Sequence, residues 1–355
     1  MTAEYEHGDH TASVARRGGR RRGLLKAAGI VFAGALVLCV AGAGWAYWHL
    51  NQNINSVDIN SALGDDRPPK IVSTPSTDPS ASTSPLPSGA LNILVLGSDS
   101  RSGEENAELG GGNSSGARSD TAMVVHIDEG RTAATVVSIP RDTLVTRPSC
   151  PTASGGTTSV AYGSMFNSAY SVGGPICAVK TVESITDVRM DHFIEIDFAG
   201  FAKLVDALGG VTVTTEEDID DDDSHLHLKA GEHHLDGTQA LALARTRHGI
   251  GDGSDLGRIG LQQTLVKALL EQISTTDLLT DPTKLYKVAD AVTGSLTTDT
   301  GLDSLTELIS LGQSLQSLPT DALKTITMPV VTAPSDPNRV VADEPEASDL
   351  WASLR

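Results

Sequence analysis

Hydrophobic and polar residues follow two patterns along this chain, one typical of strands and one typical of helices. Short apolar runs that end at glycine, serine or acidic residues predict strands; they cover residues 91–97, 121–127, 133–139, 192–197, 211–214 and 325–330. Apolar residues at helical spacing predict helices over residues 175–186, 198–208, 256–274, 281–293 and 301–317. Strands mixed with helices in this way predict one α/β or α-β-α domain.

The N-terminal part of the chain has a long uncharged stretch, residues 27–50, behind a basic segment, residues 1–26. About 20 apolar residues span a bilayer as a helix, so we expect residues 27–50 to be a transmembrane helix. The basic segment would be a cytoplasmic tail, and Trp45, Tyr47 and Trp48 would lie at the far interface. The alternative is a cleaved signal peptide, with RRGLLK as a twin-arginine motif and Ala-Gly-Ala as the cleavage site. Both interpretations place the rest of the chain outside the cell membrane.

The exported part divides by composition into three segments. Residues 51–89 become rich in Pro, Ser and Thr towards their end and predict a flexible extracytoplasmic linker. Residues 90–335 contain the predicted strands and helices and would form the folded domain. Residues 336–355 would be a C-terminal tail.

Charge and cysteine content narrow the choice of partners and compartment. The formal net charge is -19, although the first 26 residues hold six basic and three acidic groups, so the exported part is still more acidic. Such a surface repels phosphate backbones, which argues against nucleic acid as a partner. Cys39 lies in the predicted span, whereas Cys150 and Cys177 are outside it. In an oxidising compartment this pair predicts a disulfide; two free buried thiols are the alternative.

Three charged loops lie at the ends of predicted strands. They are GSDSR, ARSDT and SIPRDT, at residues 97–101, 117–121 and 138–143. Loops at strand ends of α/β sheets commonly hold catalytic groups, and Asp99 and Asp120 would converge there. Two carboxylates with substrate oxygens and waters are a common Mg²⁺ site. Taken singly, each aspartate is also typical of a turn or a helix cap, and Arg141 with Asp142 of a simple ion pair.

Arginines gather in a second region, ARTRHGIGDGSDLGRIGLQQ, which contains Arg245, Arg247 and Arg258 and ends in two glutamines. Arg258 and Gln262 are four residues apart and therefore share one helix face. Guanidinium groups bind phosphate oxygens bidentately and stay charged. Together with a Mg²⁺ site, this region predicts a pocket for a pyrophosphate. A solvated arginine pair or a surface salt bridge is the alternative.

Histidines form a further cluster beside an acidic run, at His225, His227, His233 and His234. Two histidines separated by a single residue on a strand, such as His225 and His227, point to the same side, which suits zinc. No cysteine lies nearby and no third ligand has a fixed spacing. We therefore favour a solvent-exposed edge hairpin over a zinc site.

Six motifs in order, GSDSR, ARSDT, SIPRDT, DFAGFAKLVDALGGV, LDGTQALALARTRH and DLGRIGLQQ, resemble the LytR–CpsA–Psr family of cell-wall glycopolymer ligases. The resemblance covers about residues 90–275, and it is the order of the motifs that is specific. It implies an α/β fold, an α-β-α sandwich with a central mixed sheet behind one N-terminal transmembrane helix. It also implies a long apolar pocket for a polyprenyl chain.

The resemblance assigns roles to the charged residues. Asp99 and Asp120 would hold Mg²⁺, with Mn²⁺ as an alternative ion. Arg118 and Arg141 would act in catalysis with Asp142, and Asp142 or Asp120 would accept the proton of the acceptor hydroxyl. The pyrophosphate would be clamped by Arg118, Arg141, Arg245, Arg247, Arg258 and Gln262.

Two positions depart from the family pattern. Leu261 stands where many members carry arginine, and the loop between Arg247 and Asp255 is rich in glycine. The first departure removes one peripheral basic contact, and the second leaves the register of the loop open.

The function implied by the resemblance is a membrane-anchored, single-pass phosphotransferase. It would move a glycopolymer from a polyprenyl-pyrophosphate carrier to peptidoglycan, commonly to the 6-hydroxyl of N-acetylmuramic acid, and release polyprenyl phosphate. Its partners would be the polyprenyl-linked glycopolymer, peptidoglycan and the membrane, with the oligomeric state left open. The alternatives are a hydrolase that uses water at the same site and a non-catalytic wall-binding or regulatory protein.

Overall fold

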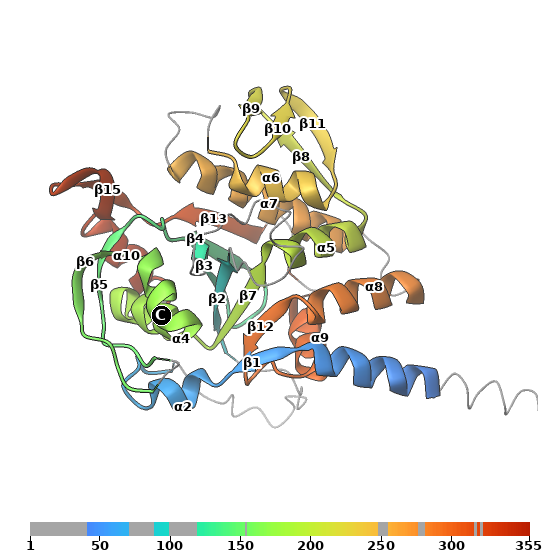
Figure 1. The fold of residues 1–355 in the computed structure, drawn as a ribbon, viewed down its shortest axis with the longest axis horizontal. Coiled ribbons are helices and arrows are strands. Elements are labelled where there is room, and N and C mark those ends of the chain that lie inside the picture. Colours follow the sequence, from blue (N-terminus) through green and yellow to red (C-terminus); the bar gives the residue numbers. More distant parts are fainter. Residues whose placement is uncertain are drawn as a thin grey trace, which may run out of the picture. The chain divides into compact units, whose positions relative to one another are not determined.

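A seven-stranded mixed sheet lies at the centre of the fold (Figure 1). In spatial order the strands are β1 (Asn55–Val57), β12 (Leu296–Asp299), β7 (His192–Asp197), β2 (Leu91–Ser98), β3 (Ser119–Ile127), β4 (Ala134–Ser138) and β13 (Leu323–Thr327). β1 is parallel to β12, β2 to β7 and β4 to β13, whereas the other neighbours are antiparallel. The α/β fold with a central mixed sheet, expected from the sequence, is confirmed.

The computed structural model describes residues 41–70, 89–98, 119–152, 155–247, 255–275, 281–315, 318–319 and 322–355. The chain divides into two units, Met1–His49 and Leu50–Arg355, and the sheet belongs to the second. In the first unit, residues 41–49 are helical and expose Trp45, Tyr47 and Trp48. No helix in the described part of the chain is long and apolar enough to cross a membrane. Most of the predicted span, including Cys39, lies outside that part.

One face of the sheet packs against α4 (Asn167–Thr186), together with the short α2 (Ile59–Leu63) and α10 (Glu346–Ala352). Side chains alternate along a strand, so Leu94 and Leu96 of β2 point to this side with Val124 of β3. All three are fully buried in the largest hydrophobic core. Burying such a side chain stabilises a fold by about 1.5–3 kcal/mol. We refer to this side, with Leu94, Leu96 and Val124, as the packed face.

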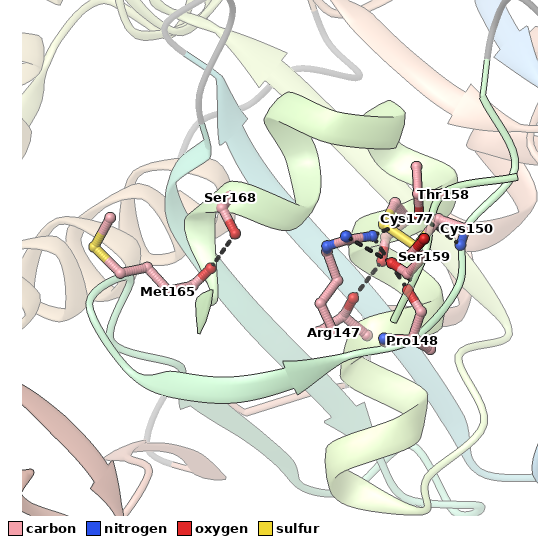
Figure 2. Close-up of a disulfide and its surroundings, with 9 residues drawn as sticks. Arg147, Pro148, Cys150, Thr158, Ser159, Met165, Ser168 and Cys177 are labelled. Atoms are coloured by element: carbon pink, nitrogen blue, oxygen red, sulfur yellow. Dashed lines mark hydrogen bonds between the residues drawn. A yellow bond between two sulfur atoms is a disulfide. The ribbon is translucent and has the colours of Figure 1, made fainter. Parts of the chain in front are cut away.

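Helix α4 begins at Asn167, ahead of the predicted start at residue 175, and is kinked at Gly173 and Gly174. A Cβ atom on Gly173 would lie 2.7 Å from that of Cys177, so glycine is required for this close approach. The predicted disulfide between Cys150 and Cys177 is formed at this kink (Figure 2).

The hairpin of β5 (Leu144–Arg147) and β6 (Ala161–Met165) leads from the end of β4 towards the disulfide. Arg147 is buried and donates hydrogen bonds to the carbonyl of Pro148, the hydroxyl of Thr158 and the carbonyl of Ser159 (Figure 2). These bonds fix the loop that carries Cys150.

The remaining helices lie on the other side of the sheet: α5 (Phe198–Leu208), α6 (Gly237–Arg245), α7 (Asp255–Thr275), α8 (Pro282–Thr293) and α9 (Leu305–Leu315). Acidic caps begin several of them, because a carboxylate satisfies free N–H groups of the first turn. Asp197 caps α5, Asp281 caps α8, and Asp236 forms a capping box with Gln239 on α6.

Helices α5, α6 and α7 share a second hydrophobic core with two hairpins. The hairpins are β8 (Val211–Thr215) with β11 (Gly231–Leu235), and β9 (Ile219–Asp221) with β10 (Leu226–Leu228). His227 is exposed on β10, where its Nδ1 lies 2.5 Å from a carboxylate oxygen of Asp220. The expected exposed hairpin is therefore present. Among the residues that the structure covers, no three potential metal ligands come together.

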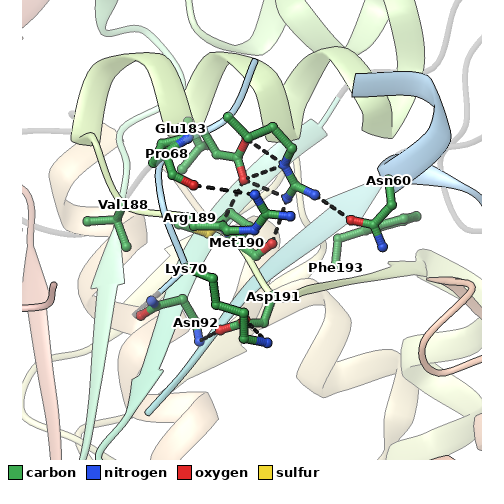
Figure 3. Close-up of polar contacts among 12 residues, drawn as sticks. Asn60, Pro68, Lys70, Asn92, Glu183, Val188, Arg189, Met190, Asp191 and Phe193 are labelled. Carbon is green, nitrogen blue, oxygen red and sulfur yellow. Dashed lines mark hydrogen bonds and ion pairs between the residues drawn. The ribbon is translucent and has the colours of Figure 1, made fainter. Parts of the chain in front are cut away.

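The prediction of a flexible linker is wrong for residues 51–70. They contribute β1 to the sheet edge and α2 to the main core, where Ile59 is fully buried. Arg67 forms a buried ion pair with Glu183 of α4, at 2.6 Å, and donates to Met190 and Asn60 (Figure 3). The polar composition of this segment gave no signal for the contacts of Arg67 with Glu183 and Met190, because these partners are more than 100 positions away. Residues 71–88 lie outside the described ranges.

The prediction of a C-terminal tail at residues 336–355 is also wrong. β15 (Asp336–Ala342) pairs with β14 (Val330–Ala333), and α10 places Ala347 and Trp351 in the main core. The predicted strand 325–330 is in fact divided between β13 and β14. A lone tryptophan in a polar C-terminus gave a weak signal, because its partners lie on distant elements.

Candidate functional site

A cavity of about 710 Å³ lies on the side of the sheet opposite the packed face, against α5, α6 and α7. We refer to this side as the cavity face. β2, β3 and β7 contribute Val95, Met123, Ile194 and Ile196 to its wall. These residues alternate along their strands with the buried residues of the packed face.

The cavity changes character along α7. Arg258 and Gln262 line it near the start of the helix, and Leu265, Val266 and Leu269 line it further along. Eleven residues of helix separate Arg258 from Leu269, which is about 16 Å. Apolar residues from other elements also line the cavity, namely Phe201, Leu204, Leu241 and Leu296. One end of the cavity is therefore cationic and the other is apolar.

A β-bulge turns Asp120 towards the cavity. Gly97 pairs with Thr121 and Ser98 pairs with Ser119, so Asp120 has no opposite residue on β2. A bulge commonly redirects a side chain next to a site. Asp120 and Thr121 both line the cavity as a result, although they are neighbours on one strand.

Arg141 follows β4 and contacts Asp120 across the mouth of the cavity. Its Nη1 donates to a carboxylate oxygen of Asp120 at 2.5 Å, and its Nε lies 3.4 Å from Asp255. Burial opposes the charge of Arg141, but attraction to Asp120, Asp255 and Asp142 outweighs it and raises the pKa of the guanidinium. Arg141 is therefore a permanently charged group in the cavity wall.

Arg258 is the most buried cation of the site. It donates to the carboxylate of Asp255 and to the backbone carbonyl of Asp120. Burial, with smaller contributions from the charges of Arg141 and Arg247, lowers the pKa of Arg258 to about 10, although the charges of Asp255 and Asp120 oppose the shift. The Nε atoms of Arg258 and Arg141 are buried and make no hydrogen bond to the residues described. Two buried N–H donors that have no acceptor among the described residues are suited to an anion.

Arg245, Arg247 and Gln262 complete the cationic end. Arg245 lies in the last turn of α6, with its guanidinium 5.0 Å from the ring centre of Phe198. The chain then leaves the helix in an extended conformation, as predicted, so Arg247 also reaches the cavity. Gln262 donates to the carbonyl of Ala244 and ties α7 to the end of α6.

Six residues were predicted to bind the pyrophosphate, and the structure brings five of them together with Asp120. They are Arg141, Arg245, Arg247, Arg258 and Gln262. Asp142 is not part of the cavity wall; its carboxylate lies 3.7 Å from Nε of Arg141. Asp99 and Arg118 fall outside the described residues, so their predicted roles remain predictions. Leu261 packs against the second hydrophobic core.

Sequence reasoning missed several residues in the cavity wall or in contact with it. Asp255 contacts both Arg141 and Arg258, and its spacing of three residues from Arg258 on a helix was an available signal. Asp221 is buried and accepts a hydrogen bond from the backbone N–H of Arg247. It was hidden in an acidic run that predicts a solvated loop. Phe198 and Asp197 also line the wall.

The donor set for a metal is incomplete in the part of the chain described. Asp120 offers one carboxylate oxygen beyond the one that contacts Arg141, and no cluster of three potential ligands surrounds it there. An oxygen donor in an anion-binding cavity fits Mg²⁺ in kind, because this ion takes few protein ligands and completes its shell with substrate oxygens and water.

Comparisons with known proteins agree with this arrangement. The model of the LytR_cpsA_psr family matches residues 46–355. The chain is 31% identical to the cell wall biosynthesis protein LcpA of Corynebacterium glutamicum, over 85% of this chain and 59% of that protein. It is 30% identical to the polyisoprenyl-teichoic acid–peptidoglycan teichoic acid transferase TagV of Bacillus subtilis, over 66% of this chain and 57% of that protein. The chain thus spans less than two thirds of the length of these relatives.

A solved structure supports the same relationship. The LytR-Csp2A-Psr enzyme from Actinomyces oris is similar with a TM-score of 0.57 at 26% sequence identity, over 77% of this chain and 92% of that one.

Proposed function

Because the chain belongs to the LytR_cpsA_psr family, we propose that it is a phosphotransferase of cell-wall assembly. It takes a glycopolymer from a polyprenyl-pyrophosphate carrier and joins it to peptidoglycan through a phosphodiester, at the 6-hydroxyl of N-acetylmuramic acid. Its relative TagV is named as a transferase of this kind.

The observation that supports this proposal best is the change of character within a single cavity. Arg141, Arg245, Arg247 and Arg258 line one end, and leucine, valine and phenylalanine side chains line the other. A polyprenyl pyrophosphate has the same two parts, a doubly charged head and an apolar tail. The strongly acidic chain otherwise repels anions, so a local group of arginines has a clear purpose.

The arginines would bind the phosphates from two sides. Arg258 and Arg141, each with a buried Nε that lacks an acceptor, would bind phosphate oxygens from one side. Arg245 and Arg247 would bind them from the end of α6. Phosphoryl transfer requires mainly that groups be positioned in line and that developing charge be neutralised. Charged groups that are held rigidly in a cavity from which water is partly excluded would position the reacting groups and neutralise the developing charge.

The acceptor hydroxyl would attack the phosphorus on the sugar side, and polyprenyl phosphate would leave along the apolar end. Of the two proposed proton acceptors, Asp120 lines the cavity and Asp142 does not, so we assign this proton to Asp120. Asp120 would also hold Mg²⁺ with Asp99, and the ion would supply further neutralisation of phosphate charge. Asp142 would instead help to orient Arg141.

The test uses the full-length protein in lipid vesicles, with a polyprenyl-pyrophosphate donor labelled in the glycan and with peptidoglycan fragments. We expect label on peptidoglycan, loss of that label with EDTA, and a loss of at least about a hundredfold in Arg247→Ala. Arg339→Ala changes an arginine of β15 outside the cavity wall and should remain active.

Two results would contradict the proposal. Release of polyprenyl phosphate without labelled peptidoglycan, across a range of acceptors, would identify a hydrolase. Donor binding without any cleavage would identify a non-catalytic binding protein.

A further inference from the structure

We propose that α8, α9 and the C-terminal end of α7 form a docking face for the lipid bilayer, defined by Ile273, Leu285 and Ile309. This face would lie against the outer leaflet and hold the apolar end of the cavity next to the lipid. The inference rests on the proposed function and on the predicted membrane span at residues 27–50.

Three large apolar side chains are exposed on three successive helices. Ile273 of α7 is 45% exposed, Leu285 of α8 is 42% exposed and Ile309 of α9 is 48% exposed. α8 also carries Tyr286 and Val288, yet only Thr293 of this helix is fully buried. A single exposed apolar residue needs no explanation, but α8 and α9 are both amphipathic helices that leave a large apolar side chain exposed, which favours an apolar surface.

The position at which the chain enters the fold identifies the occupant of this surface. Asn51 accepts a hydrogen bond from the backbone N–H of Leu305 at the start of α9, at 3.0 Å. Asn53 donates to Asp290 of α8 at 3.4 Å. The predicted span ends at Leu50. The two residues that contact α8 and α9 therefore lie within about one helical turn of the end of the span, which is about 5 Å along the chain. In Figure 1 both helices lie beside β12 and β1, the strand that follows this entry point.

The cavity approaches the same face. Leu265 and Leu269 line its apolar end on α7, and Ile273 continues their line one turn later at the surface. Leu296, which also lines the cavity, follows closely after the end of α8. A polyprenyl chain that enters between these helices would therefore pass from bilayer to cavity over a short, continuously apolar path.

Charge around the docking face does not favour a particular lipid. Lys284 and Lys287 flank Leu285 and suit the headgroup layer, where long basic side chains extend towards phosphate. Glu307 lies near Ile309, so the charge is mixed. The apolar side chains and the nearby end of the span carry the inference. A second protein on this face would have to displace the bilayer that the predicted span brings there.

The test measures the depth of single labels in the membrane. Full-length protein in a Cys39→Ser background receives one cysteine, Leu285→Cys or Ile309→Cys, which is labelled with a fluorophore and reconstituted in phosphatidylcholine–phosphatidylglycerol vesicles. Val331→Cys is the matched control, because Val331 is 43% exposed on β14. Doxyl lipids should quench the labels at 285 and 309 at least about twofold more than the label at 331.

Three results would overturn the inference. Equal weak quenching at all sites would show that the domain stands clear of the bilayer. Labels at 285 and 309 that are protected from aqueous iodide but not quenched by doxyl lipids would show that a protein covers the face. Failure of the protein to float with vesicles would remove the membrane span on which the inference depends.

The labelling reports no glycan transfer, so the two proposals fail separately. A docked protein without transfer activity would contradict only the proposed function. A functional readout follows from the double variant Leu285→Ser/Ile309→Ser. It should use a vesicle-embedded long-chain donor about tenfold less well while its use of a water-soluble short-chain donor is unchanged. Equal use of both donors would count against docking.

Discussion

The two faces of the central sheet are built from the same strands but serve different purposes. Leu94 and Val95 are neighbours on β2; Leu94 is fully buried in the main core, whereas Val95 lines the cavity. Both are typical strand residues, and alternation alone sends them to opposite sides. The difference teaches that the sequence of a strand specifies the strand, while the helices opposite each face decide whether its residues contribute stability or binding.

Charged groups follow the same division. On the packed side, Arg67 and Glu183 are buried as a fully paired ion pair, and Glu195 accepts a hydrogen bond from Tyr170 at 2.5 Å. On the cavity side, Arg141 and Arg258 keep buried Nε atoms without hydrogen bonds to the described residues. Ion pairs occur on both sides, but the arginines of the cavity side also keep buried donors that no described residue satisfies, and these mark the side that binds.

The strongest way to separate the two sides is to compare Arg141, which lies between β4 and β5, with Arg147, the last residue of β5. Arg141→Ala should reduce glycan transfer by about 10²–10³-fold, because it removes a charged donor from the reacting phosphates. Arg147→Ala should lower the free energy of unfolding by about 1–3 kcal/mol and leave transfer by the folded protein unchanged. Transfer rates and urea unfolding measure the two effects. Similar losses of transfer activity in both variants would contradict the separation of stability and binding between the two sides of the sheet.

The second test removes a crosslink on the packed side. Cys150→Ala/Cys177→Ala should lower the free energy of unfolding by about 3 kcal/mol, because the disulfide closes a loop of 27 residues. The affinity for a pyrophosphate analogue should not change, since neither cysteine lines the cavity. Thermal unfolding and titration calorimetry provide the measurements. A large fall in affinity in the folded variant would show that the two sides are coupled.

The third test enlarges one valine on each face. Val124→Phe should destabilise the protein by about 1–3 kcal/mol, because the packed face has no room for a larger side chain. Val95→Phe should change stability by less than about 1 kcal/mol, because the ring can enter the cavity, but it should weaken binding of a long polyprenyl chain. Urea unfolding measures the change in stability of each variant, and a lipid binding assay measures its affinity for a long polyprenyl chain. Equal destabilisation would mean that the cavity wall is as tightly packed as the core.

The smallest expected effect concerns Glu195 on the packed side of β7. Burial raises the pKa of Glu195, although hydrogen bonds from Tyr170 and Ser98 oppose the shift. The unfolded chain therefore releases this proton first as the pH rises, and the free energy of unfolding falls from the ordinary pKa of the carboxyl up to its raised value.

Glu195→Gln should be insensitive to this change, so the difference in unfolding free energy between the variant and the wild type should shift in favour of the variant as the pH rises. The midpoints of urea unfolding of both proteins, measured from pH 4 to pH 7, test this prediction. A shift in favour of the wild type as the pH rises would show that the native carboxyl is stabilised in its charged form.

Local patterns were sufficient to predict most elements of the sheet and its helices. The strand at β2 and the helix α5 appear where apolar alternation and helical spacing indicated them, because these signals depend on neighbouring residues. Several short elements escaped this logic, namely β1, β5, β6, β12 and α10. β1 and α10 are short, and each is stabilised by contacts with elements far away in the sequence.

The candidate site was predictable in its residue types but not in its geometry. Arg258 and Gln262 were expected on one helix face and are found there. The position of Asp120 depends on a bulge against β2, and the role of Asp255 depends on the approach of Arg141. Neither feature is visible in a linear pattern, because each arises from the register or packing of two elements.

The buried ion pair between Arg67 and Glu183 has a practical consequence for anyone who wishes to separate the folded domain from the N-terminal segment. A fragment that begins in the Pro- and Ser-rich stretch after residue 70 lacks β1, α2 and Arg67, and it leaves Glu183 buried with no cation. An uncompensated buried charge costs about 3–5 kcal/mol, a large part of the stability of an ordinary domain. The cut that preserves the fold lies at Leu50, where the second unit begins.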